Sequence, residues 1–106
     1  MMDYIEANSW CTEQNGNLPI PTSQEENDFL ADIGSTWLGA NTQDSINLSY
    51  TNWVCHRNGC EPSGDGPQVQ LIVGYRWDVN WGYGGWNDQM ISGDSLATCY
   101  LAIKGK

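Results

Sequence analysis

The chain contains few basic residues. Four lysines and arginines stand against 13 aspartates and glutamates among 106 residues, which gives a formal charge of −9. The four cations are scattered and form no patch; they are Arg57, Arg76, Lys104 and Lys106. Binding to nucleic acid or to an anionic membrane surface needs clustered cations, because neutralised phosphates supply much of the affinity. The composition therefore excludes both classes of partner.

Long hydrophobic runs are missing as well. The best apolar stretch, Val69 to Tyr75, is far shorter than the roughly 20 residues of a membrane span and contains Gln70. Neither a basic nor an apolar segment follows Met1-Met2-Asp3, so we expect no signal peptide here. A secreted protein of this sequence would have had its signal removed or replaced. The length predicts a single domain over residues 1–106, without membrane insertion.

Histidine is nearly absent, which argues against several kinds of enzyme. His56 is the only histidine, so a Ser-His-Asp or Cys-His site has no visible partners. A carboxylate pair for glycoside hydrolysis could be sought in Glu61 with Asp65 or Asp88, yet nothing marks one of them as a proton donor. We therefore expect a protein without catalytic residues.

Four cysteines in a short chain favour disulfides and a secreted, extracellular location. The sequence permits three pairings. Cys55 and Cys60 flank a tight polar turn, so the simplest scheme joins these two and pairs Cys11 with Cys99. A zinc site at Cys55, His56 and Cys60 is the rival interpretation, but it lacks a C-x2-C spacing and a second histidine.

The hydrophobic pattern predicts two short helices in the first third of the chain. One runs from Asp3 to Gln14 with Tyr4, Ala7, Trp10 and Cys11 on its apolar face, and the other from Ser23 to Gly34 through Phe29, Leu30 and Ile33. Ser23 and Glu26 have the spacing of a capping box. Strands are expected at 36–40, 69–75 and 98–103, with largely irregular loops at 41–67 and 74–95.

Oxygen-bearing side chains cluster in two of the expected loop segments, Glu61 to Asp65 and Trp86 to Gln89. Calcium takes six to eight oxygen ligands from carboxylates, amides, backbone carbonyls and water, and flexible loops can supply such a cage. The alternative is that these are solvated turn residues, because turns are rich in Pro, Gly, Asp and Asn.

Read in order, these pieces resemble a C-type lectin-like domain. The resemblance rests on Tyr4, Ala7 and Cys11, then Gly16-Asn17-Leu18, residues 23–30, Trp37-Leu38-Gly39-Ala40, Tyr50-Thr51-Asn52-Trp53, Glu61-Pro62-Ser63, Trp86-Asn87-Asp88 and Cys99. It covers nearly the whole chain. It implies an α+β fold with two helices, two small antiparallel sheets and a long irregular loop region that carries the ligand site. It also implies the Cys11–Cys99 pairing.

The resemblance further implies a calcium ion as cofactor and a sugar bound through two vicinal hydroxyls. The implied metal and sugar ligands are Glu61, Ser63, Asn87 and Asp88, with Asp65 as an additional acidic metal ligand. Four departures qualify this assignment. Ser63 stands where the family has Asn or Asp, and the loop around Asp65 is short. The two positions that form the family's second disulfide hold Gln68 and Ile91 here, which leaves Cys55 and Cys60 as a local substitute. The family's first strand is short or missing, which could leave an edge open for a partner.

A glycine-rich aromatic segment precedes Trp86. Trp81 and Tyr83 are candidates for stacking on the apolar face of a sugar ring, while core packing in a small domain is the alternative for Trp77 and Trp81. The remaining tryptophans are expected to pack in the core; they are Trp10, Trp37, Trp53 and Trp86.

Together these features predict a secreted lectin that binds mono- or oligosaccharides and glycoconjugates with calcium. Glycans of microbial surfaces, and hence innate immunity, are among its expected settings. The aromatic loop favours galactose or N-acetylgalactosamine, whereas Glu61 resembles the mannose-type motif. The alternatives are sugar binding without calcium, or protein or ice binding on the same fold. A homodimer or oligomer is expected because lectins gain avidity through multivalency.

Overall fold

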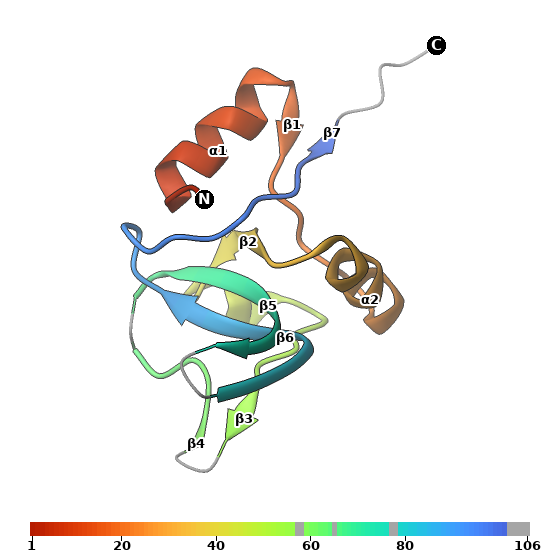
Figure 1. The fold of residues 1–106 in the computed structure, drawn as a ribbon, viewed down its shortest axis with the longest axis vertical. Helices are drawn as coiled ribbons and strands as arrows, with labels where there is room; N and C mark the ends of the chain where they lie inside the picture. Colours follow the sequence, from red (N-terminus) through yellow and green to blue (C-terminus); the bar gives the residue numbers. More distant parts are fainter. Residues whose placement is uncertain (57–58, 65, 77–78, 102–106) are drawn as a thin grey trace.

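The computed structural model describes residues 1–56, 59–64, 66–76 and 79–101 (Figure 1). Its helices are α1 (Tyr4–Glu13), α2 (Gln24–Ile33) and the 3-10 helix η1 (Asp44–Asn47). The strands are β1 (Gly16–Asn17), β2 (Thr36–Asn41), β3 (Cys55–His56), β4 (Gly59–Cys60), β5 (Gln68–Arg76), β6 (Val79–Gln89) and β7 (Tyr100–Leu101). They form antiparallel sheets in the orders β2-β5-β6, β1-β7 and β3-β4. The expected α+β fold with two α-helices is confirmed.

Side-chain caps define where both α-helices begin. The Asp3 carboxylate accepts a hydrogen bond from the Glu6 N–H at 2.8 Å, and Glu6 accepts one from the Asp3 N–H at 3.1 Å. Ser23 caps α2 by accepting from the Glu26 N–H, which is half of the predicted capping box, whereas the Glu26 carboxylate accepts from the Thr22 hydroxyl. These bonds satisfy backbone donors that a helix leaves unpaired in its first turn.

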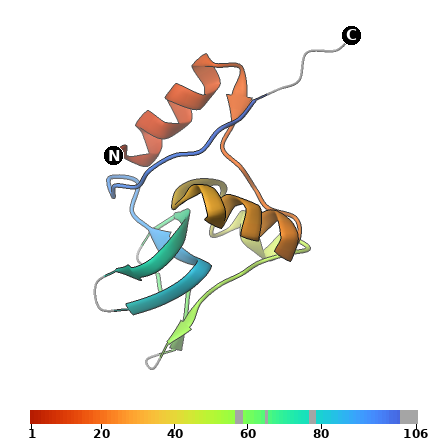
Figure 2. The same ribbon diagram turned by 45° about the vertical axis from the view of Figure 1, so that its right-hand side comes forward.

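The three-stranded sheet carries a separate apolar core on each face. On β2, Trp37 packs with Ala7, Cys11 and Leu18, whereas Leu38, the next residue, packs with the core under α2. Successive side chains of a strand point to opposite faces, so one strand serves both cores. Figure 2 shows α1 and α2 as two separate helices that do not pack as a pair. The sheet is therefore the element that joins the two halves of the domain.

The apolar face of each helix is narrower than predicted. Ala7 and Cys11 are buried on α1, but Trp10 is 37 % exposed. On α2 the buried set includes Leu30, while Phe29 and Ile33 are each more than half exposed. Trp10, which was expected to pack in the core, is thus exposed, and Phe29 and Ile33 also lie outside the buried stripe of α2, because each helix contacts its core along a single narrow stripe.

The largest correction concerns residues 74–95, which were expected to form an irregular loop. Residues 79–89 form strand β6, which pairs with β5 from Gln68↔Gln89 to Arg76↔Val79. The pairing shifts register at two places, and Gly74, Gly82 and Gly84 in this hairpin have positive φ angles. Glycines at such irregularities hide the strand from a propensity-based prediction. The expected strand at 98–103 is shorter, since β7 spans only Tyr100–Leu101 and residues 102–106 lie outside the described part.

Both predicted disulfides are present, one joining Cys11 to Cys99 and the other Cys55 to Cys60. The first links α1 to the segment before β7, across 88 residues of sequence; the second closes the β3-β4 hairpin. The zinc alternative at Cys55, His56 and Cys60 is therefore wrong. In the described residues, no helix is long and apolar enough to cross a membrane.

The two disulfides should contribute unequally to stability. The chain-entropy model predicts that replacing Cys11 and Cys99 with alanine costs about 4 to 5 kcal/mol, against about 2 kcal/mol for Cys55 and Cys60, because the first bridge closes a much longer loop. Urea unfolding of the two double variants measures the difference. Equal losses of unfolding free energy would contradict a loop-length origin.

Candidate functional site

The predicted ligand residues of the Glu61 loop meet the end of strand β6. The Ser63 hydroxyl donates to Glu61 Oε1 at 2.8 Å and lies 3.4 Å from Asp88 Oδ1. The Glu61–Pro62 peptide bond is cis. Glu61 is only 6 % exposed, and its N–H donates to the Val54 carbonyl at 2.8 Å. The structure thus brings together two carboxylates and a hydroxyl, although Glu61 and Asp88 are 27 residues apart in the sequence.

Asp88 is held by the backbone of the same loop. Its side chain is fully buried, Oδ1 accepts from the Ser63 N–H at 3.0 Å, and Oδ2 accepts from the Gly64 N–H at 2.8 Å. Hydrogen bonds from backbone donors to a carboxylate offset part of the cost of removing its charge from water. Asp88 therefore fixes the loop against β6 and places its own charge at the centre of the cluster.

Asn87 differs from its neighbour in orientation. The register pairs Asn87 with Gln70 and Asp88 with Val69, so regular alternation puts the two ligand candidates on opposite faces of the sheet. Asn87 is 3 % exposed, and no described residue forms a hydrogen bond with its side-chain amide. Among the described residues, the fully buried side-chain atoms without a hydrogen-bond partner are Gln70 Oε1 and Ser95 Oγ. The Asn87 amide is not one of these sealed atoms, so a ligand can reach it.

Trp86, the residue before Asn87, is fixed from several directions. Its indole N–H donates to Asn27 Oδ1 of α2 at 2.8 Å, and both residues are fully buried. The Asn27 amide also donates to the Gly84 carbonyl at 3.0 Å, which Asn52 reaches at 2.9 Å. A Cβ at Gly84 would lie 2.6 Å from Asn27 Nδ2, and its φ is +91°, so only glycine fits there.

The segment around Trp53 forms the other wall around Trp86. Tyr50 and Trp53 each meet the Trp86 ring edge-to-face, with ring centroids 5.9 and 5.7 Å away. Trp86 also donates its N–H to Asn52 and accepts from the Val54 N–H. Burial, and then the nearby charge of Asp28, raise the pKa of Tyr50. The expected packing role of Trp53 and Trp86 is confirmed.

The two stacking candidates occupy different environments. Trp81 is 4 % exposed, whereas Tyr83 is 50 % exposed. Only Tyr83 of this pair presents a large ring surface to solvent, because the core already uses Trp81. The stacking hypothesis for Trp81 is therefore not supported by its position.

The donor chemistry of these side chains fits calcium better than zinc. Glu61 and Asp88 offer carboxylates, Asn87 an amide and Ser63 a hydroxyl, all of them hard oxygen donors. Among the described residues, no three His, Cys, Asp or Glu side chains are grouped closely enough to hold a metal. Amide, hydroxyl, backbone or ligand oxygens would have to complete a cage. The proposed ligand Asp65 lies outside the described residues.

Sequence reasoning missed Asn27 and Asn52, which position the site without being ligands. The helical spacing could have identified Asn27. It lies three residues before Leu30 and four before Ala31, and all three are buried on the same stripe of α2. A polar residue on a buried helix stripe needs hydrogen-bond partners, so its presence there predicts a tertiary contact.

Comparison with known proteins agrees with this architecture. The family model described as the lectin C-type domain matches residues 1–100. No match was found among curated proteins.

Solved structures with a similar fold include the cow C-type carbohydrate-recognition domain of CD23, whose structure was determined in the presence of a GlcNAc2Man3 oligosaccharide. It is 26 % identical, with a TM-score of 0.66, over 97 % of this chain and 83 % of that one. Human lithostathine is 20 % identical with a TM-score of 0.68, over 92 % and 82 % of the two chains. The mouse scavenger receptor C-type lectin domain is 19 % identical with a TM-score of 0.66, over 92 % and 80 %.

Replacing Asn27 with alanine should destabilise the domain by about 2 to 3 kcal/mol, because the buried Trp86 N–H loses its acceptor and Gly84 loses one donor. Gln24→Ala is the matched control on the same helix; its exposed bond with Tyr50 predicts a loss below about 1 kcal/mol. Chemical denaturation compares the two. A similar loss in both variants would show that Asn27 has no special role.

Proposed function

The chain belongs to the C-type lectin domain family, and from this premise we propose that it binds carbohydrate through Glu61, Ser63, Asn87 and Asp88. The observation that carries the proposal is the buried cluster in which Ser63 bonds to Glu61 and donates its N–H to Asp88. Two carboxylates withdrawn from water and held together by a hydroxyl and two backbone N–H groups suit a binding site better than a turn. Members of this family are generally binding modules without catalysis.

Calcium is the proposed cofactor. Glu61, Ser63 and Asp88, which contact one another, would hold it, and Asn87 is proposed to join them although the register puts its side chain on the other face of β6. Asp65 is proposed as a further ligand. The bound ion would supply coordination positions in which neutral sugar hydroxyls can replace water. The residues of the chain choose the geometry of those hydroxyls, since carboxylates accept hydrogen bonds and the Asn87 amide both donates and accepts.

Ser63 adapts the site to its short loop. Its hydroxyl bonds to Glu61 and lies near Asp88, so it bridges the two carboxylates. A sugar hydroxyl that approaches would compete for the same acceptors. We propose that Ser63, whose side chain is shorter than asparagine or aspartate, holds the two carboxylates together and contributes less to the metal cage than either of those residues would.

Tyr83 supports the lean toward galactose or N-acetylgalactosamine. It lies on β6, four residues before Asn87, and half of its surface is exposed. An exposed ring can stack on the apolar face of a sugar, which adds affinity without needing charge. Glu61, by contrast, resembles the mannose-type motif and favours a mannose-type sugar.

Calcium-independent sugar binding is the second candidate, and one observation favours it. Both oxygens of Asp88 already accept backbone hydrogen bonds from Ser63 and Gly64, so the cluster holds together without a cation. In that version, hydrogen bonds and Tyr83 bind the sugar alone.

The wider setting follows from the same premise. Two disulfides are typical of proteins folded in an oxidising compartment, so we propose secretion. The partners would be mono- or oligosaccharides and glycoconjugates, including glycans of microbial surfaces. A homodimer or oligomer would raise the avidity of a weak single site.

Removal of calcium with EGTA should abolish binding on a glycan array, and Asn87→Ala should weaken it about tenfold or more. The Asn87 amide has no hydrogen bond among the described residues, so this variant should stay folded. The array is run in calcium and again in EGTA, with unfolding curves recorded for each variant.

Asp32→Asn removes an exposed carboxylate on α2 and is the charge control, with unchanged binding expected. Undiminished binding in EGTA would reject the calcium mechanism and favour the second candidate. The absence of any glycan signal in either condition would reject sugar binding.

Truncation of Tyr83 should reduce sugar affinity while leaving the fold intact. Tyr83→Ala is expected to weaken binding about 3- to 10-fold, because it removes the exposed ring, and Tyr83→Phe should stay near the parent value. Isothermal titration with the best array sugar measures both. If alanine and phenylalanine behave alike, the ring does not contact the sugar.

A further inference from the structure

The β3-β4 hairpin lies at the end of the molecule opposite α1, as both ribbon views show (Figures 1 and 2). Each strand has only two residues, and the pairs are Cys55 with Cys60 and His56 with Gly59. A two-stranded hairpin is at best marginally stable in water. The disulfide between Cys55 and Cys60 joins the two strands, so we expect it to keep this hairpin closed.

The base of the hairpin adjoins the proposed sugar site. Next to the Cys55–Cys60 pair lies the pair of Val54 with Glu61, in which the Glu61 N–H donates to the Val54 carbonyl at 2.8 Å. The Glu61 carboxylate in turn accepts from the Ser63 hydroxyl at 2.8 Å. The disulfide is therefore the immediate neighbour, across the hairpin, of a carboxylate in the candidate ligand set.

Val54 anchors the first strand of the hairpin on the main sheet. Its N–H donates to the Trp86 carbonyl at 3.3 Å, and a Cβ at Gly85 would lie 3.1 Å from Val54 Cβ, so Val54 packs directly on β6. Glu61 follows the second strand, which the disulfide and the Val54 bond connect to this anchored side. The position of Glu61 thus depends on the hairpin remaining closed.

The two disulfides differ in their access to solvent. Cys55 and Cys60 are both exposed, whereas Cys11 is fully buried and Cys99 is half-buried. The rate of thiol–disulfide exchange depends on whether a reductant can reach a sulfur atom. A reductant should therefore open the hairpin disulfide first.

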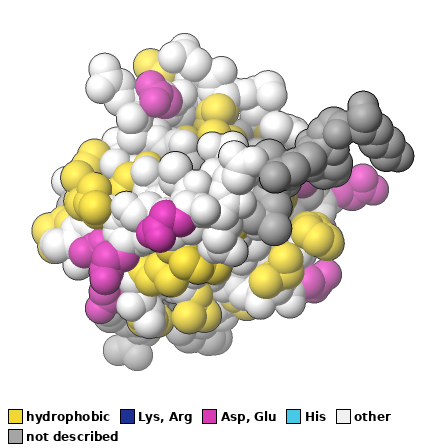
Figure 3. Space-filling view, turned by 90° about the horizontal axis from the view of Figure 1, so that it is seen from above, with side chains coloured by type: hydrophobic (Ala, Val, Ile, Leu, Met, Phe, Trp, Pro, Cys, Tyr) yellow, Lys and Arg dark blue, Asp and Glu magenta, His cyan; other side chains and the backbone are white. Residues whose placement is uncertain are grey.

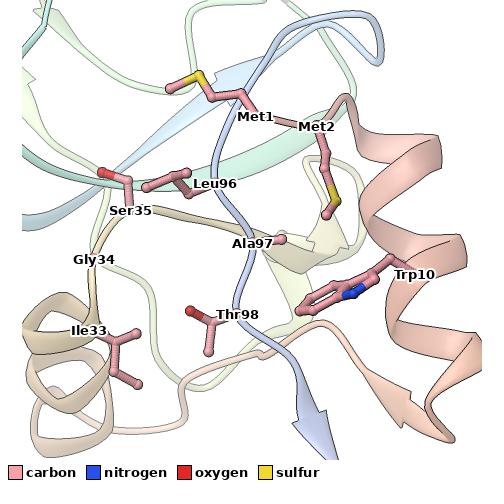
Figure 4. Close-up of a pocket in the computed structure, with 9 residues that line it drawn as sticks. All are labelled: Met1, Met2, Trp10, Ile33, Gly34, Ser35, Leu96, Ala97 and Thr98. Atoms are coloured by element: carbon pink, nitrogen blue, oxygen red, sulfur yellow. The ribbon is translucent and has the colours of Figure 1, made fainter.

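The surroundings of Cys99 explain its protection. It follows the segment Leu96–Thr98, which runs between Trp10 of α1 and Ile33 of α2 (Figure 4). Cys99 also packs against the core that contains Cys11. The long-range disulfide is thus enclosed by both halves of the domain, and the hairpin disulfide is not.

The charge of the chain decides which reductant suits a test. The formal charge is −9, and Figure 3 shows acidic side chains on the face that it draws, with no Lys or Arg side chain among its described atoms. A net charge repels reagents of the same sign. An uncharged dithiol is therefore a better probe than an anionic thiol such as glutathione.

We propose that the Cys55–Cys60 disulfide is a reducible clamp that positions Glu61 in the proposed sugar site. A dithiol would give two electrons and two protons to the disulfide, so that its S–S bond breaks into two thiols while the dithiol closes to its own disulfide. The hairpin would then open, and Glu61 would leave its place beside Ser63. The effect on sugar binding rests on the proposed function, whereas the effect on Glu61 can be measured without any ligand.

Reduction under native conditions tests the order in which the disulfides open. The full chain is treated with dithiothreitol and then with iodoacetamide, and mass spectrometry identifies the labelled cysteines. Cys55 and Cys60 should be labelled while Cys11 and Cys99 remain joined. Simultaneous labelling of all four cysteines would overturn the proposal, because no selective clamp would then exist.

Backbone NMR of the selectively reduced chain reports the position of Glu61. Its amide signal should move toward its position in the urea-unfolded, reduced chain by at least about half of the difference, because the isolated hairpin is marginal. The control is the Gly39 N–H, which donates to the Pro19 carbonyl at 2.9 Å on β2, the strand at the sheet edge opposite β6. The Gly39 signal should stay in place, which separates local opening from unfolding of the whole domain.

Sugar binding is then compared between the two redox states. Affinity for the best array sugar should fall at least about fivefold on reduction and return on reoxidation, because a mobile Glu61 must be ordered again on binding. The double variant Cys55→Ser with Cys60→Ser should bind like the reduced chain and should not respond to dithiothreitol. The reoxidation of the parent chain makes the same comparison without any substitution.

The outcomes separate this proposal from the proposed function. An oxidised chain that binds no glycan would reject the proposed function, and the Glu61 amide signal would still decide whether the disulfide holds this residue. A Glu61 signal that does not move on selective reduction would overturn the clamp. So would a glycan affinity that is the same in the oxidised and selectively reduced chains.

Discussion

The structure depends on the position of one buried side chain, the indole of Trp86. Asn27 accepts its N–H, Tyr50 and Trp53 pack edge-to-face against its ring, and its backbone pairs with Asn52 and Val54. Trp86 thereby links α2, the long loop and β6 at one point. Since Asn87 and Asp88 directly follow it, any shift of the indole would move the candidate ligands as well.

The same contacts explain how a loop with little regular structure can carry a binding site. Asp88 of β6 accepts from the Ser63 and Gly64 N–H groups, and Val54 accepts from the Glu61 N–H while its own N–H donates to Trp86 of β6. The Glu61–Gly64 turn is thus held to β6 directly at one end and through Val54 at the other. Each bond also pairs a group that is buried or partly buried. Holding the loop and placing its charges are therefore achieved by the same hydrogen bonds, which limits how far either can change alone.

The opposite part of the domain is built differently. Around α1, packing against Trp37 and the Cys11–Cys99 bridge stabilise the core. The sheet separates this core from the one under α2, because β2 supplies alternate residues to each side.

Local chemistry was sufficient for part of this description. The cap at Ser23 and the Cys55–Cys60 bridge follow from residue type and spacing, because each joins neighbours in sequence. The Cys11–Cys99 bridge, across 88 residues, was the simplest remaining pairing and the one that the family resemblance implied. The oxygen donors Glu61, Asn87 and Asp88 were proposed from their clustering in sequence and from the same resemblance. Strand β6 could not be predicted in this way, since its glycines suppress strand propensity and only pairing with β5 stabilises it. The partners of Asn27, the burial of Trp81 and the exposure of Trp10 likewise required the tertiary structure. Contacts between residues some 57 to 59 positions apart, such as Asn27 with Gly84 and Trp86, are determined by packing and not by local sequence.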